Sequence, residues 1–161
     1  LLIPQIAFLF GVQVTLVVLR LDGIWFSLVW SHLLFVLPYV FLSLGPIYRS
    51  YDQRITDVAV TLCRSPWQAF LKVKLPMLMR PVLFSAAIGF SVSVAQYLPT
   101  LFIGAGRFDT ITTEAVNLAS GSDRRIVSVY ALFQLLTPLM VFLSALFIPR
   151  FYFRQRKGMQ I

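Results

Sequence analysis

Hydrophobic residues gather in four long runs without Asp, Glu, Lys or Arg, at 1–19, 24–48, 81–106 and 126–149. A bilayer core of about 30 Å needs roughly 20 helical residues, so each run is long enough to cross it. The runs lack the alternation of barrel strands, and backbone groups in hydrocarbon must pair within helices or closed barrels. The pattern therefore predicts an all-α membrane protein with four transmembrane helices, at about 1–19, 26–48, 82–104 and 126–149.

Composition supports the membrane class. The 161 residues are 58% hydrophobic and only 12% charged, with a mean hydropathy of +0.82, whereas ordinary globular chains carry roughly 25% charged residues. A basic soluble nucleic-acid-binding domain is excluded, because its cations would need an exposed polar face. The single cysteine, Cys63, excludes an internal disulfide.

The positive charges indicate the orientation of the chain in the membrane. Most of the 14 Lys and Arg residues lie in the loop at 49–81 or after residue 149, whereas the segment at 105–125 balances its cations with acids. Cytoplasmic loops carry the excess of Lys and Arg, so we expect the loop at 49–81 in the cytoplasm and the segment at 105–125 outside.

The cytoplasmic loop has the pattern of two short helices. Ile55, Val58, Ala59 and Leu62 repeat at helical spacing and form one apolar face. A second helix is predicted from a capping box of Ser65 and Gln68, with Pro66 at the first helical position and Trp67, Phe70 and Leu71 on one face. We expect Pro76 and Pro81 to end this helix before the next transmembrane helix. From the residues alone, the loop either lies on the membrane surface or docks with another protein.

The loop resembles the EAA signature of permease subunits of binding-protein-dependent ABC importers, which reads E-A-A, three residues, G, nine residues, then I-x-L-P. Here the matching residues are Asp57-Val58-Ala59, Cys63 and Val73-Lys74-Leu75-Pro76, with the spacing kept throughout. Val58 and Cys63 depart from the signature. The family glycine is free to adopt left-handed angles, so either the turn at Cys63 avoids positive φ or the docking geometry differs.

The resemblance implies that the loop couples the permease to a cytoplasmic ABC ATPase subunit. Asp57 takes the acidic place of the motif, and Trp67 and Phe70 are the implied anchors. The implied coupling residues are Asp57, Ala59, Cys63, Ser65, Pro66, Trp67, Phe70, Leu75 and Pro76. The chain has no G-x-x-x-x-G-K-[ST] motif, so we expect it to bind no cofactor, to be no enzyme, and to leave ATP and Mg to the partner ATPase.

Polar residues inside the predicted spans are candidates for a translocation path. They are Gln13, Gln96, Gln134 and Thr137. The alternative is that they form hydrogen bonds between helices. His32, near the outer end of the second run, is assigned to packing or hydrogen bonding, because no second histidine is present to complete a metal site.

The outer segment at 105–125 is predicted to contain a short helix that ends at Gly121. It reads either as a solvated connector or, by the resemblance, as the surface that faces a periplasmic solute-binding protein. Glu114, Arg124 and Arg125 are the candidate contacts.

Together these features predict the C-terminal part of a longer, multi-pass permease in the bacterial inner membrane, with a second permease half as a further partner. The segment Leu98-Pro99-Thr100 to Gly104 resembles the thiamine, iron(III) and sulfate branch, and a thiamine-type permease most of all. The alternative is a channel or scaffold subunit, unrelated to ABC transporters, whose amphipathic loop lies on the membrane.

Overall fold

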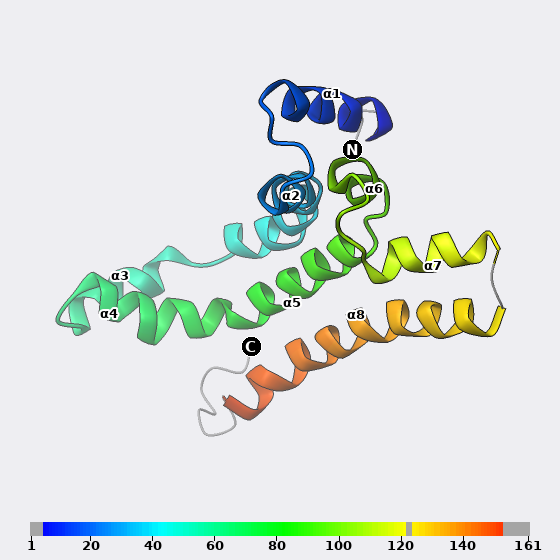
Figure 1. The fold of residues 1–161 in the computed structure, drawn as a ribbon. Helices are drawn as coiled ribbons and strands as arrows, with labels where there is room; N and C mark the ends of the chain where they lie inside the picture. Colours follow the sequence, from blue (N-terminus) through cyan, green and yellow to red (C-terminus); the bar gives the residue numbers. More distant parts are fainter. Residues whose placement is uncertain (1–4, 122–123, 153–161) are drawn as a thin grey trace. The chain divides into compact units, whose positions relative to one another are not determined.

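The computed structural model describes residues 5–121 and 124–152, which are helical with short connections (Figure 1). Three helices of this part of the chain are long and apolar enough to cross a membrane: Trp25–Arg49, Pro66–Val94 and Arg124–Pro149. The helix predicted at 1–19 is observed as α1 (Gln5–Val18), which is shorter, and residues 1–4 lie outside the described residues. The described residues therefore confirm an all-helical chain with three membrane-capable helices, and the fourth span stays a prediction.

The chain divides into two compact units, residues Leu1–Pro38 with Phe90–Leu139 and residues Tyr39–Gly89 with Met140–Ile161. Three long helices each contribute to both units: α2 (Trp25–Arg49), α5 (Leu75–Val94) and α8 (Arg124–Tyr152). The basic tail predicted to mark the cytoplasmic side, with Arg154, Arg156 and Lys157, lies outside the described residues.

The first unit is built around the contact between α1 and α6 (Leu98–Gly104). Leu9, Leu16 and Ile103 are buried together, and Phe102 of α6 lies against the ring of Phe10 with 5.0 Å between ring centroids. The unit also holds α7 (Ile111–Ala119), which begins with a capping box between Thr110 and Thr113. A short helix is therefore present in the segment at 105–125, as predicted, but it ends at Ala119 with Ser120 as its cap, before the predicted Gly121.

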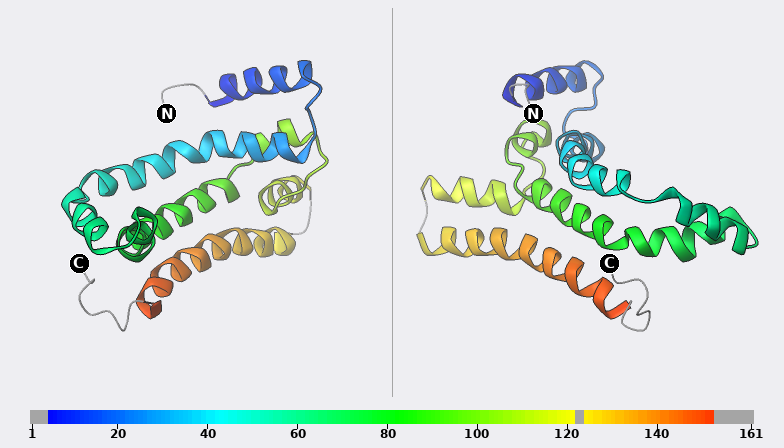
Figure 2. Two further views of the ribbon diagram at one scale, coloured as in Figure 1. Left: turned by 90° about the vertical axis from the view of Figure 1, so that its left-hand side faces the viewer. Right: turned by 180° about the vertical axis from the view of Figure 1, so that it is seen from behind.

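The second unit contains α3 (Gln53–Leu62), α4 (Pro66–Ala69) and a π-helical turn, η1 (Phe70–Lys74), that leads into α5. Figure 2 shows α3 folded beside α4 at the end of the helix that α4, η1 and α5 form together. Further along α5, Phe84 packs edge-on against Phe142 of α8, with 5.6 Å between ring centroids.

The prediction that Pro76 and Pro81 end the helix is wrong, because one helix runs from Pro66 to Val94 through both prolines. In η1 the N–H of Leu75 bonds to the carbonyl of Phe70, five residues back. This wider turn precedes Pro76 directly, and it relieves the clash that a proline ring makes with the carbonyl four residues before it. Pro81 removes one further backbone bond, which a membrane helix tolerates.

The predicted helix at 82–104 is also not continuous. It ends at Val94, and α6 begins at Leu98 after a non-helical segment at 95–97. Pro99 lies in the first turn of α6, where its missing N–H costs nothing because the first N–H groups of a helix have no partner within it. The proline that the sequence places inside a long helix therefore starts a new one.

Candidate functional site

The first helix of the loop at 49–81, α3, is fixed at its start and exposed along its apolar face. Asp52 caps it by accepting a 2.9 Å hydrogen bond from the backbone N–H of Arg54. Of the four residues on the predicted face, only Ala59 is buried, and Leu62 is 83% exposed. Asp57 lies on the same helix with its side chain in solvent. Within the described residues, the apolar face of α3 is thus largely uncovered.

The turn between α3 and α4 passes through Cys63 in an extended conformation, with φ of −100° and ψ of 152°. Its N–H bonds to the carbonyl of Ala59 at 3.0 Å. Of the two sequence-based alternatives, this is the one in which the turn avoids positive φ. Cysteine meets no backbone penalty here, although the related signature has glycine.

The second helix of the loop, α4, starts at the predicted cap. The Ser65 hydroxyl accepts the backbone N–H of Gln68 at 3.3 Å, and Pro66 occupies the first turn. Trp67 and Phe70 stack, with ring centroids 5.5 Å apart and an interplanar angle of 18°. Trp67 remains 67% exposed. The stacked pair is therefore held in a fixed arrangement and presented outward.

Leu75 and Pro76 complete the motif in the first turn of α5, directly after η1. Leu75 is exposed and Pro76 half-buried. The predicted coupling residues thus lie on α3, in the turn that follows it, on α4 and η1, and at the start of α5, all within one unit. What the sequence did not reveal is the π-helical turn between them, because its cause lies in backbone bonding.

A polar network joins α2, α5 and α6 in the other unit. His32 Nδ1 lies 3.0 Å from the Ser93 hydroxyl and Nε2 lies 3.0 Å from Thr100 Oγ1. The Thr100 hydroxyl donates to the Gln96 carbonyl at 3.1 Å, so its oxygen accepts the proton on His32 Nε2, and Nδ1 accepts from Ser93. The Gln96 amide closes the network by donating from Nε2 to the His32 carbonyl at 3.2 Å. The hydrogen-bonding role predicted for His32 is confirmed.

Gln96 keeps one unused acceptor in this network. The side chain is 7% exposed, and its Oε1 atom has no hydrogen-bond partner. The His32 carbonyl fixes the amide orientation, because only the NH₂ side can donate to it. A buried acceptor without a partner costs about 1–3 kcal/mol, so Oε1 is a place for a donor to bind.

The other polar candidates are spread over the unit and do not join this network. Gln13 donates from Nε2 to the Phe102 carbonyl at 3.3 Å, which ties α1 to α6. Thr137 donates to the Phe133 carbonyl of its own helix at 2.7 Å. Gln134 is half-buried on α8. Gln13 therefore forms a hydrogen bond between two helices. This is the role that the sequence analysis gave as the alternative to a translocation path.

The candidate outer contacts lie on α7 and at the start of α8. Glu114 is half-buried in the first turn of α7, while Arg124 and Arg125 are exposed at the first two positions of α8. The sequence missed a contact nearby: Arg107 donates from Nη1 to the Gly23 carbonyl at 3.3 Å, and the Gly23 N–H donates to the Ile103 carbonyl at 3.2 Å. These bonds hold the link between α1 and α2 against the end of α6.

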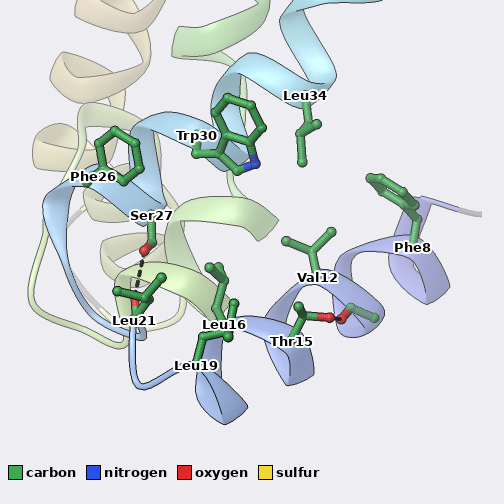
Figure 3. Close-up of a pocket in the computed structure, with 11 residues that line it drawn as sticks. Phe8, Val12, Thr15, Leu16, Leu19, Leu21, Phe26, Ser27, Trp30 and Leu34 are labelled. Carbon is green, nitrogen blue, oxygen red and sulfur yellow. Dashed lines mark hydrogen bonds between the residues drawn. The ribbon is translucent and has the colours of Figure 1, made fainter.

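An apolar cavity of about 710 Å³ lies between α1 and the start of α2 (Figure 3). Its two hydroxyls are already used: Thr15 donates to the Gly11 carbonyl at 2.8 Å, and Ser27 donates to the Leu21 carbonyl at 2.5 Å. The remaining walls are apolar side chains such as Phe8, apart from the indole N–H of Trp30 (Figure 3). The cavity therefore suits a largely apolar group, and the Trp30 N–H is the donor that its lining adds.

Comparison with known proteins finds similarity to ABC transporter permeases. The chain is 42% identical over 159 residues to the inner membrane ABC transporter permease protein YnjC of Escherichia coli (strain K12), an alignment that covers 99% of the chain and 31% of YnjC. It is 33% identical over 93 residues to the molybdenum transport system permease protein ModB of Azotobacter vinelandii, covering 57% of the chain and 41% of ModB. It is 30% identical over 61 residues to the probable sulfate transport system permease protein cysT of Anthoceros angustus, covering 38% of the chain and 21% of that protein.

The chain spans about a third of the length of YnjC. No protein-family model matches the sequence, and no solved structure does. These relatives support a relationship to ABC transporter permeases. The exposed α3–α4 pair is interpreted on that basis.

Proposed function

We propose that this chain is part of the transmembrane permease subunit of an ABC importer in the bacterial inner membrane. It moves a small solute from a periplasmic binding protein into the cytoplasm by alternating access, together with a second permease half. Three membrane-capable helices and the ABC permease relatives support this function. Separate cytoplasmic subunits bind ATP and Mg and hydrolyse the nucleotide, and this chain converts their motion.

The docking site for the ATPase is the α3–α4 pair, and one observation carries this proposal. Trp67 and Phe70 form a stacked aromatic pair on a capped helix, and Trp67 is largely uncovered. Aromatic side chains already held in place bury large area at small entropic cost when a partner binds. Asp57, one helix away, supplies a charge for a basic residue of the ATPase.

The solute path is proposed to run along Gln13, Gln96, Gln134 and Thr137. The unpartnered Oε1 of Gln96 supports this most directly, since a solute with N–H or O–H groups would satisfy it. Glu114, Arg124 and Arg125 are proposed to meet the solute-binding protein at the outer surface, where charges mainly raise the association rate. Because the segment at 98–104 resembles the thiamine, iron(III) and sulfate branch, we propose that the solute is of the kind that permeases of this branch carry.

The test is capture of the ATPase. The full-length protein is co-purified from detergent with the ATP-binding subunits encoded beside it, comparing native protein with Trp67→Ala and Asp57→Arg at equal expression. Trp25→Ala is the matched control, because Trp25 is 64% exposed at the other end of α2, outside the proposed docking site. We expect the native protein and the control to retain the ATPase, and the two loop variants to lose most of it.

A second outcome would identify the alternative function. If native protein retained no ATPase, or if both loop variants retained as much as native, the exposed residues of α3 and α4 would instead lie on the bilayer surface. The chain would then be a channel or scaffold subunit with a membrane-bound loop, and the importer assignment would fail.

A further inference from the structure

Lys74, the last residue of η1, contacts two tyrosines that precede α3. Its Nζ donates a 3.2 Å hydrogen bond to the hydroxyl of Tyr48 and lies 5.2 Å from the centroid of that ring. The same ammonium lies 5.6 Å from the centroid of the Tyr51 ring. One ammonium thus contacts both tyrosines: it bonds to the hydroxyl of Tyr48, and it lies within the roughly 6 Å of each ring centroid at which a cation and an aromatic ring attract.

The contacts connect three elements of one unit. Tyr48 is in the last turn of α2, Tyr51 lies in the non-helical link to α3, and Lys74 belongs to η1. Tyr51 also hydrogen-bonds through its hydroxyl to Thr56 in the first turn of α3, at 3.0 Å. The cytoplasmic end of α2 is therefore joined to the α3–α4 pair by side chains as well as by the short link in the backbone.

The position of Lys74 in the signature makes this contact informative. The motif I-x-L-P leaves this residue unspecified, and here it lies between Val73 and Leu75. Lys74 is half-buried, whereas Lys72 in the same turn is exposed. The two lysines carry the same charge next to the same docking site, so the difference between them is the pair of tyrosines.

We propose that Lys74 is a positioning residue that holds the α3–α4 pair to the end of α2, so that a movement imposed on the pair displaces α2 as well. This inference rests on the proposed function of the pair as the ATPase docking site. The link at 50–52 is non-helical and, by itself, can bend as the pair moves. With the ammonium held over both rings, the pair and the last turn of α2 move as one body.

The test reports the movement of each element separately in the full transporter with its ATPase subunits. An environment-sensitive fluorescent amino acid is placed at Val60 of α3 in one set of proteins and at Ile47 of α2 in another; both side chains are exposed. Fluorescence is compared with Mg-ATP and with Mg-ADP. In the native background we expect both probes to respond to the nucleotide.

In Lys74→Met the two probes are expected to separate. The response at 60 persists because docking is intact. The response at 47 falls to about a third or less, since the hydrogen bond to Tyr48 and both cation–ring contacts are gone. Lys74→Arg, which keeps a cation over the rings, restores the response at 47. Lys72→Met removes the same charge from the exposed neighbour and leaves both responses at native size, as the control for charge and folding.

The proposal is overturned by a response at 47 that is unchanged in Lys74→Met, or by an absent response at 47 in native protein. Loss of both responses in Lys74→Met also overturns it, because Lys74 would then act in docking itself. Failure of the proposed function is seen separately, as failure of the native protein to retain the ATPase subunits.

Discussion

His32 Nε2 lies 3.0 Å from the hydroxyl oxygen of Thr100, which ties α2 to the first turn of α6 across 68 positions of sequence. Thr100 is 1% exposed, and its hydroxyl donates a hydrogen bond to the Gln96 carbonyl. The break between α5 and α6 is therefore held from the side by a residue of another helix. This contact explains how a membrane helix can be interrupted at 95–97 while the backbone carbonyl of Gln96 still finds a partner.

Replacing His32 with leucine is expected to destabilise the protein. The change removes both ring nitrogens and leaves the Ser93 and Thr100 hydroxyls to find other partners, at a cost of about 1–3 kcal/mol. Thermal unfolding of the full-length protein in detergent measures the loss. Leu33→Ala, at the neighbouring exposed position, is the control. An unfolding temperature of His32→Leu equal to that of the control would contradict a structural role for the network.

The network also shows where sequence reasoning ends. Periodicity and capping residues located α3 and the start of α4, since both depend on neighbours within a few positions. The partners of His32 lie 61 and 68 residues away, and no local pattern indicates that distance. The predictions at Pro76, Pro81 and Pro99 were wrong for a related reason. Whether a proline ends a helix, lies within it or starts it depends on the surrounding backbone, such as the π-helical turn before Pro76.

Gly23 is expected to tolerate no side chain. Its φ is +61°, and a Cβ atom there would lie 3.2 Å from the guanidinium of Arg107. The left-handed backbone dominates the penalty, since the arginine tip can move, so Gly23→Ala should lose about 1–2 kcal/mol of stability. Gly45→Ala, inside α2 with nothing within 4 Å, should be neutral or up to about 1 kcal/mol stabilising.

A double variant separates the two causes at Gly23. If backbone strain dominates, Arg107→Ala combined with Gly23→Ala unfolds at the temperature expected from adding the two single effects. If crowding by the guanidinium dominates, the double variant is more stable than the sum, because the arginine is no longer there to be displaced.

The cap of α4 is expected to support the aromatic pair. Ser65→Ala removes the side-chain acceptor of the Gln68 N–H and leaves only its 3.1 Å bond to the Ser65 carbonyl. Loss of such a cap typically costs a helix about 1 kcal/mol and loosens the start of the helix that carries Trp67. Hydrogen exchange at the Gln68 amide should accelerate about five- to ten-fold, since 1.4 kcal/mol corresponds to a factor of ten. Ser65→Asp, which also caps helices well, should restore slow exchange. Equal exchange in native protein and Ser65→Ala would show that the cap does not hold this turn.

Cys63 gives the clearest contrast between the signature and this chain. The family motif has glycine there, which predicts that Cys63→Gly should not destabilise the protein. The extended backbone at Cys63, with φ of −100°, predicts the opposite, because glycine gains nothing in this region and adds freedom to the unfolded chain. We expect Cys63→Gly to lose about 0.5–1 kcal/mol of stability relative to Cys63→Ala, measured by chemical unfolding of the full-length protein.

ATPase capture should be equal in both variants. If Cys63→Gly instead captured more ATPase than Cys63→Ala, the turn would adopt left-handed angles on docking, and the arrangement of α3 and α4 described above would be that of the undocked state.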